Sequence, residues 1–307
     1  MRILIALGGN ALSSPDGRSG PREQVDAARR AMVHVARLVA AGHEVVLTHG
    51  NGPQVGDLLA QGEIAAAQVP PVPLDWRDAE TQGAIGYVLL SALASSLAAY
   101  GRQTPVAALV TRTLVDASDP GFRHPTKPVG RYRRQLPAMD HGQVWENMGP
   151  RGWRRLVASP EPLEILDIGA IRTLVGAGYV VIAAGGGGIP TVRDDDGQTR
   201  GVEAVIDKDL TAALLARQIG ADILVIATDV ENAAVGFGSP GQRDLAHVTA
   251  TELRAYAAAG EFAEGSMRPK VEAALRFAEA GGRAVITSLA RITDAVDGRA
   301  GTVVEAG

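Results

Sequence analysis

Short unbroken apolar runs alternate along the chain with longer stretches in which apolar residues recur every three or four positions. The runs have the length and composition of buried strands, and the stretches have the periodicity of amphipathic helices. The predicted strands lie at 2–7, 44–48, 106–110, 180–184, 223–228 and 283–286, with an edge strand from 302, and the predicted helices lie at 21–41, 79–100, 164–177, 269–279 and from 207 and 249. Because strands and helices alternate, we predict an α/β fold with a mostly parallel sheet covered on both faces.

The segment 116–162 departs from this pattern, because proline, glycine, tryptophan and arginine replace alanine and leucine and the periodicity fades. Eight arginines and lysines lie between Arg123 and Arg155 against two acidic residues, and Arg131, Arg133 and Arg134 have no role that the sequence defines. We predict a basic flap that closes over a small anionic ligand. A surface for single-stranded nucleic acid is the alternative, since bases could stack on aromatic side chains, here Phe122, Tyr132, Trp145 and Trp153.

Three predicted strands run directly into glycine-rich turns, at Gly8-Gly9-Asn10, at Gly50-Asn51 and at 185–188. The carboxyl ends of parallel strands meet at one edge of a sheet, where open α/β sheets bind ligands. Glycines let the backbone approach a ligand and expose its N–H groups, which suits a phosphate or a carboxylate. His49 lies beside the second turn, either as a general base or as a structural hydrogen-bonding group.

Lysine is rare in this chain: 27 of the 30 basic residues are arginine, and the three lysines are Lys127, Lys208 and Lys270. Each lysine lies in a distinctive local sequence, PTKPVG, VIDKDL or GSMRPKVEAA. An ammonium group is a compact charge that can follow a moving phosphoryl group, whereas guanidinium is a fixed planar fork. Asp207 and Asp209 flank Lys208 at a predicted helix start, where free N–H groups favour an anion.

Composition and missing motifs exclude several classes of protein. The 307 residues carry a net charge of −4, which gives no overall attraction for nucleic acid, and the chain has no cysteine for disulfides or thiolate sites. No P-loop, dinucleotide-binding glycine motif, nucleophile elbow or histidine pair with metal-ligand spacing occurs. No apolar run reaches the length of a membrane span and no secretory signal is evident, so we expect a cytoplasmic protein.

The remaining features, three lysines, three glycine-rich strand ends and a few aspartates, suit phosphoryl transfer. Catalysis of this reaction is mainly positioning and neutralisation of charge on the transferring group. An anionic acceptor such as a carboxylate or carbamate needs no general base. The absence of a convincing base therefore agrees with such an acceptor.

Seven motifs in chain order resemble those of the carbamate kinases, a group within the amino acid kinase family. The motifs are ALGGNAL (6–12), THGNGPQVG (48–56), TQGAIGY (81–87), PTKPVG (125–130), GGGGIP (185–190), GVEAVIDKDL (201–210) and GSMRPKVEAA (265–274). The resemblance spans nearly the whole chain. It implies a three-layer αβα sandwich, a homodimer, and reversible phosphoryl transfer between MgATP and carbamate, with Mg²⁺ bridging the phosphates and few protein ligands on the metal.

The resemblance also implies roles for individual residues. Gly8, Gly9, Asn10, Gly50 and Asn51 would hold carbamate and the transferring phosphoryl group, with Lys127 of the flap closing over them. Lys208, oriented by Asp209, would bridge the phosphates during transfer, and the catalytic set is Lys127, Lys208, Asp209, Asn10 and Gly9. Gly185, Gly186, Asp229, Met267 and Lys270 would surround the nucleotide.

We expect residues 1–195, including the flap, to form the acceptor lobe and residues 196–307 to form the nucleotide-binding lobe. Two other functions stay open from the sequence. One is another member of the amino acid kinase family that phosphorylates a different small acid. The other is a regulator that binds nucleotide or carbamoyl phosphate without turnover.

Overall fold

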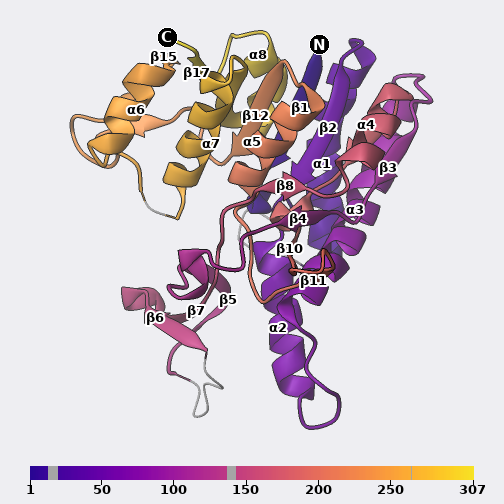
Figure 1. Cartoon of the computed structure of the whole chain (residues 1–307). Helices are drawn as coiled ribbons and strands as arrows, with labels where there is room; N and C mark the ends of the chain where they lie inside the picture. The colour runs from indigo at the N-terminus through magenta and orange to yellow at the C-terminus, as the bar shows by residue number, and fades with distance from the viewer. Residues whose placement is uncertain (13–19, 137–142, 264) are drawn as a thin grey trace.

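A single large sheet organises the chain in the computed structural model, which describes residues 1–12, 20–136, 143–263 and 265–307 (Figure 1). Its strand order is β15-β17-β16-β12-β1-β2-β9-β3. The strands from β16 to β3 run parallel, whereas β17 is antiparallel to β16. In sheet order the strands are His247–Thr249, Thr302–Glu305, Arg283–Ser288, Ile223–Thr228, Arg2–Leu7, Glu44–His49, Val180–Ile182 and Val106–Ala108.

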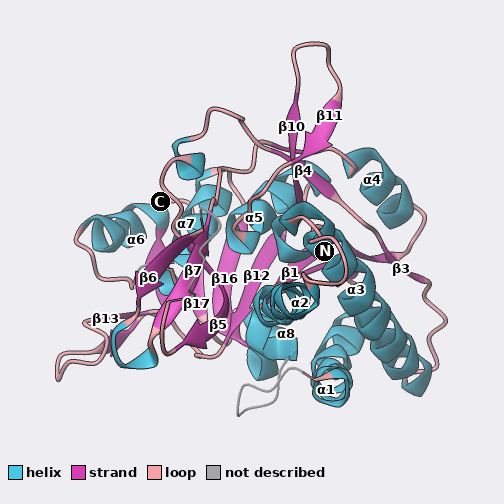
Figure 2. Cartoon of the chain, turned by 90° about the horizontal axis from the view of Figure 1, so that it is seen from below, coloured by secondary structure: helices cyan, strands magenta, loops and turns pink. Residues whose placement is uncertain are grey.

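Helices cover both faces of this sheet, as the view from below shows (Figure 2). One layer consists of α1 (Pro21–Ala40), α3 (Leu74–Ala99) and α8 (Ile292–Val296), and the other of α4 (Ile168–Gly176), α5 (Lys208–Ile219), α6 (Ala250–Ala258) and α7 (Met267–Glu279). Alternate residues of β1 feed the two cores: Ile3 and Ile5 pack toward α1 and α3, while Leu4 packs toward α5 and α7. The predicted three-layer αβα sandwich is confirmed.

Helix α3 is long and apolar enough to cross a membrane by length and composition alone. In the fold it is a core helix, because Leu89, Leu93 and Leu97 are buried in the layer that it shares with α1. Its amino-terminal half carries Asp78, Thr81 and Gln82, which are buried polar residues. This half extends beyond the sheet edge and supports the site described below.

Several helix boundaries differ from those predicted. Helix α2 (Gly52–Ala65) follows the second glycine turn directly, where only a turn was expected. Pro53 occupies its first turn, a position that proline favours in helices. Helix α4 begins at Ile168, since Glu164–Ile165 forms strand β8. The helix predicted from 249 is α6, and Thr249 and Glu252 form a complete capping box at its start.

The segment 116–162 contains regular structure that the sequence pattern did not reveal. Strands β5 (Lys127–Arg133), β7 (Trp153–Val157) and β6 (Val144–Asn147) form an antiparallel sheet, which we call the flap sheet. It lies below the main sheet beside α2 (Figure 1). The strands lack strict alternation because one of their faces carries arginine and aromatic side chains instead of a large apolar core.

The described residues also form two smaller sheets. Strands β11 (Thr199–Gly201), β10 (Ile189–Arg193), β4 (Arg112–Leu114) and β8 form a four-stranded sheet, in which β10 and β11 pair as an antiparallel hairpin. Strands β13 (Ala234–Val235) and β14 (Arg243–Asp244) pair in the segment after β12. The four-stranded sheet continues from the glycine-rich end of β9, so it borders the site.

Candidate active site

The carboxyl ends of β1, β2, β9 and β12 lie at one edge of the main sheet. Leu7 and His49, the last residues of β1 and β2, are direct neighbours in register. The Gly8 N–H donates to the Ala227 carbonyl of β12 at 3.1 Å, and the Gly50 N–H donates to the Leu7 carbonyl at 3.0 Å. The predicted meeting of the glycine turns is confirmed, but these two N–H groups are used within the sheet.

The glycines of the first two turns matter because their backbones approach one another closely. A Cβ atom at Gly50 would lie 3.1 Å from the Gly9 nitrogen and 3.3 Å from Cδ of Lys208. A Cβ atom at Gly8 would lie 3.1 Å from the Ala227 carbonyl oxygen. The side chain of Lys208 therefore passes directly over the acceptor turn, which links the two halves of the predicted site.

The third turn, η4 (Gly185–Gly187) with Gly188, is densely packed. Gly186, Gly187 and Gly188 have positive φ, and Ala184 before them is a left-handed non-glycine residue with φ 52°. A Cβ atom at Gly186 would lie 2.3 Å from Nδ2 of Asn51. The turn also has a side-chain support, because Nε2 of Gln82 donates to the Gly185 carbonyl at 3.0 Å.

His49 is buried beneath this turn and has a structural role. A Cβ atom at Gly185 would lie 2.3 Å from Nε2 of His49, so the ring fills the space under the glycine. Its Nδ1 lies 3.1 Å from the Gly50 carbonyl oxygen. Burial lowers the pKa of His49 to about 4, which keeps the ring neutral near pH 7. The geometry therefore favours the structural alternative over a general base.

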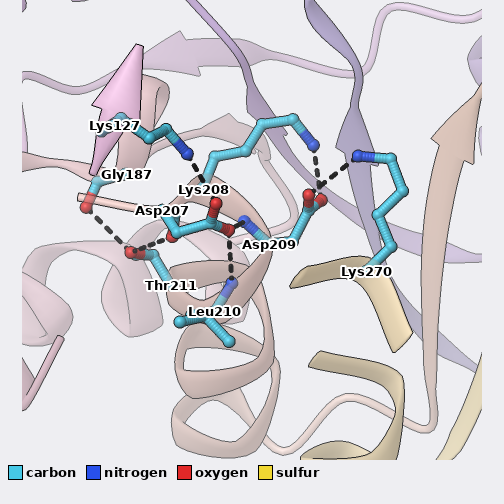
Figure 3. A network of polar contacts seen from close by, with 8 residues as sticks. All are labelled: Lys127, Gly187, Asp207, Lys208, Asp209, Leu210, Thr211 and Lys270. Atoms are coloured by element: carbon cyan, nitrogen blue, oxygen red, sulfur yellow. Dashed lines mark hydrogen bonds and ion pairs between the residues drawn. The ribbon is translucent and has the colours of Figure 1, made fainter. Parts of the chain in front are cut away.

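The three lysines converge on two aspartates at the start of α5 (Figure 3). Nζ of Lys208 lies 2.5 Å from Oδ1 of Asp209, and Nζ of Lys270, which α7 carries, lies 3.0 Å from Oδ2 of the same carboxylate. Nζ of Lys127, at the start of β5, lies 2.6 Å from Oδ2 of Asp207. Residues that are distant in sequence and belong to three elements thus form one charged cluster.

Asp207 has two functions in this cluster. Its Oδ1 caps α5 by accepting from the N–H groups of Asp209, at 2.9 Å, and Leu210, at 3.3 Å. Its Oδ2 holds Lys127 of the flap sheet. The carboxylate therefore joins the flap to the helix start, where aligned backbone N–H groups favour an anion.

Burial and charge together set the protonation of the buried lysine and aspartate. Burial lowers the pKa of Lys208, and the charge of Asp209 counteracts this shift. Burial alone would raise the pKa of Asp209, but the charges of Lys208 and Lys270 outweigh it and hold that pKa below its ordinary value. Asp209 is thus an anion that keeps two cations side by side in a nearly solvent-free position.

Asp229, Met267 and Asn10 were also predicted as site residues, and each lies at or next to the end of an element. Asp229 follows β12 at the same sheet edge, and Met267 begins α7, three residues before Lys270, with its side chain packed against the core. Asn10 belongs to the short helix η1 (Gly9–Leu12) after β1.

The aromatic side chains of the flap sheet are paired with its arginines. The guanidinium carbon of Arg133 lies 5.1 Å from the ring centre of Trp145, and that of Arg154 lies 5.0 Å from the ring centre of Tyr132. Arg133 also forms an ion pair with Glu63 of α2. A guanidinium group thus already lies over two of the four aromatic rings considered for base stacking, which weakens the nucleic-acid alternative.

Sequence reasoning missed four polar residues that shape the site. Asp78, Thr81 and Gln82 lie in the amino-terminal half of α3 and contact Asn51 or the glycine turn. Asp207 was predicted as a helix cap but not as the partner of Lys127. The signal available in the sequence was their spacing, because Thr81 and Gln82 lie on the same helical face as the buried Ile85 and Leu89.

Comparisons with known proteins agree with this geometry. A family model described as the amino acid kinase family matches residues 1–288. The carbamate kinase of Thermococcus kodakarensis is 46% identical over 313 residues, which cover 99% of this chain and 98% of that protein. The carbamate kinase-like protein YahI of Escherichia coli is 44% identical, with 98% and 97% covered.

The fold comparison leads to the same family. The solved structure of carbamate kinase from Giardia lamblia bound to AMP-PNP has a TM-score of 0.93 and 40% sequence identity, and the match covers 100% of this chain and 98% of that chain. Fold, site geometry and full-length similarity thus converge, and this chain belongs to the amino acid kinase family.

Proposed function

We propose that this protein is a carbamate kinase, which transfers a phosphoryl group reversibly between ATP, bound as its Mg²⁺ complex, and carbamate. The observation that carries the proposal is the placement of Lys208 between the acceptor turn at Gly50 and the carboxylate of Asp209. Relatives at 46% identity over the full length bear the name carbamate kinase. The chain is accordingly an ATP-dependent phosphotransferase with a carbamate acceptor.

The charged cluster supplies electrostatic stabilisation in this reaction. Asp209 holds the ammonium groups of Lys208 and Lys270 together before any ligand arrives, so the cations need little reorganisation when phosphates bind. Lys208 lies over the acceptor turn and is suited to follow the phosphoryl group in transit. Lys270, which α7 carries, is suited to neutralise the phosphates that remain on the nucleotide.

The bond changes require no proton transfer. One oxygen of carbamate forms a bond to the γ-phosphorus of ATP while the bond from that phosphorus to the bridging oxygen breaks, and the electron pair leaves on ADP. Because the acceptor is already an anion, no base must activate it. This agrees with the buried and neutral state of His49.

The backbone and the flap would position the reactants. Gly9, Asn10 and Asn51 would hold the acceptor, whereas Gly8 and Gly50 keep the turns close together, since their N–H groups bond within the sheet. The bond from Lys127 to Asp207 joins the flap sheet to the start of α5. In this position Lys127 would exclude water and add positive charge beside the acceptor. Gly185, Gly186 and Asp229 would lie along the nucleotide.

The residues of the site fit a Mg²⁺ ion that is held mainly by phosphate oxygens. Asp207 and Asp209 are already paired with lysines, and the described part of the chain has no group of three or more His, Asp or Glu suited to a metal. When bound, the ion would neutralise charge on the phosphates.

We further propose that residues 1–195 serve the acceptor and residues 196–307 the nucleotide, and that the protein works as a homodimer in the cytoplasm, in arginine metabolism. Several apolar residues on α2 and α3 are exposed, among them Trp76 and Tyr87. Their exposure supports a subunit interface formed by these two helices. Light scattering coupled to gel filtration, with Tyr87→Arg as the disrupting variant, tests the dimer.

The decisive experiment measures ATP formed from carbamoyl phosphate and MgADP with a coupled reporter enzyme, using Lys208→Ala as the blank. Rapid ATP formation that the variant abolishes is the expected result. If no ATP forms although ADP binds, the acceptor is a different small acid, and a panel of carboxylate and phosphonate acceptors with MgATP identifies it.

A further inference from the structure

Asn51 precedes α2 but does not cap it with its side chain. An asparagine at this position usually accepts hydrogen bonds from the first N–H groups of the helix. Here the side chain turns toward α3 instead, where Nδ2 donates to Oδ1 of Asp78 at 3.0 Å and to Oγ1 of Thr81 at 3.0 Å. The Asn51 side chain therefore does not cap α2 but forms two hydrogen bonds that fix its amide group.

The orientation of this amide follows from counting hydrogens. The Thr81 hydroxyl donates its single hydrogen to the main-chain carbonyl of Asp78 at 2.9 Å, so toward Asn51 it can only accept. The atom that faces Thr81 must therefore be the amide nitrogen. Both hydrogens of Nδ2 are used by Asp78 and Thr81, and Nδ2 has none left for a ligand.

The amide is also held by packing. It lies against Gly186, where an added Cβ would come within 2.3 Å of Nδ2 and 2.7 Å of Cγ. Asp78 is fully buried, and burial, together with the nearby charges of Asp75 and Glu203, raises its pKa well above the ordinary value. Oδ1 of Asp78 can accept from Asn51 whether or not the other oxygen, Oδ2, carries a proton.

We propose that Asn51 recognises the amino group of the acceptor substrate through its Oδ1, and that Asp78 and Thr81 are positioning residues that keep this oxygen available. This inference rests on the proposed function. With its N–H groups used, Asn51 can interact with a ligand only as a hydrogen-bond acceptor. Carbamate offers an NH₂ group, whereas acetate, of the same size, offers a methyl group and leaves this oxygen without a hydrogen-bond donor.

The test compares carbamoyl phosphate with acetyl phosphate as phosphoryl donors to MgADP, since the two differ only in NH₂ against CH₃. The wild type should prefer carbamoyl phosphate in kcat/KM. In Asn51→Ala the preference should fall by roughly 10- to 100-fold, almost entirely through slower use of carbamoyl phosphate.

The positioning role has its own matched pair of variants. Thr81→Val removes the hydroxyl at constant shape and lets the amide turn over, so the preference should fall about tenfold, mainly through KM for carbamoyl phosphate. Thr81→Ser keeps the hydroxyl and should restore the preference. Melting temperatures and ADP affinity, measured for each variant, separate this effect from loss of fold.

The outcomes distinguish this inference from the proposed function. Suppose that the wild type forms ATP from carbamoyl phosphate but Asn51→Ala and Thr81→Val slow the reactions of both donors equally. Then Asn51 does not recognise the amino group, and the kinase assignment stands. If the wild type forms ATP from neither donor, both are wrong. Should Thr81→Val fail to fold, Asn51→Ala alone decides.

Discussion

Gly56→Ala tests whether the close contact between the flap sheet and α2 positions Lys127. Gly56 of α2 faces Gly130 of β5, and an added Cβ would lie 2.8 Å from the Gly130 Cα. Ordinary contact begins at 3.4 Å, so one backbone must move by about 0.6 Å. No side-chain rotation can relieve the clash, because a Cβ atom is fixed by its own backbone and the atoms that it would meet are main-chain atoms of Gly130.

The displacement should reach the site through Lys127, which lies three residues before Gly130 in the same strand. Misplacement of a reacting group by about 1 Å costs on the order of 100-fold in rate, so we expect kcat to fall roughly tenfold. Stability should change little, because alanine favours the helix by about 1 kcal/mol and offsets the clash.

The assay is ATP formation from carbamoyl phosphate and MgADP, with kcat, KM and melting temperature measured together. Gly83→Ala in α3 is the matched control, because its added Cβ would meet nothing within 4 Å. The control should keep full activity. A Gly56→Ala enzyme with the kcat of the wild type would show that the contact between flap and α2 does not position Lys127.

Three further predictions concern the buried charges. Lys208→Arg keeps the charge but not its shape and should lower kcat by roughly 100-fold with an unchanged fold by circular dichroism; near-normal turnover would contradict the role of Lys208 as a moving point charge. Asp209→Asn removes the carboxylate that pairs with two largely buried ammonium groups and should lower the free energy of unfolding by about 3 kcal/mol in urea, with MgADP restoring part of it; no loss would refute the pairing. The pKa of His49 is about 4 in the fold against 6.5 in the unfolded chain. Only the unfolded state gains the proton as pH falls from 6.5 to 4, so the free energy of unfolding should drop by about 3 kcal/mol over that window. His49→Gln should lack this part of the pH dependence, and equal pH profiles would contradict it.

The main sheet and its two helical layers could be predicted from the sequence because their signals are local. The apolar run from Val180 is buried on both faces in the structure, and the glycines after it end the strand as expected. The shared edge of the glycine turns could be predicted because parallel strands present their carboxyl ends at the same edge of a sheet. The three lysines stood out because arginine is the default base of this chain.

The flap sheet and the partners of Asn51 could not be predicted in the same way. Strands β5, β6 and β7 pair with one another across loops, and arginines rather than an apolar face cover their aromatic residues, so no alternation marks them. The bonds from Asn51 to Asp78 and Thr81 span 27 and 30 residues. Such contacts depend on how α2 and α3 cross, which no local pattern encodes.

The turn from Ala184 to Gly188 has a consequence for mutational scanning. Its contribution to the site is made of main-chain atoms, and each of its glycines is bounded by a neighbour: a ring, an amide, a carbonyl or a hydroxyl. Alanine scanning works by deleting atoms, but here every alanine would add one. A scan would report collisions at these positions and could not test the nucleotide contacts that we propose for this backbone. Replacing single peptide bonds by esters, which removes one N–H without adding bulk, is the way to make this part of the site visible.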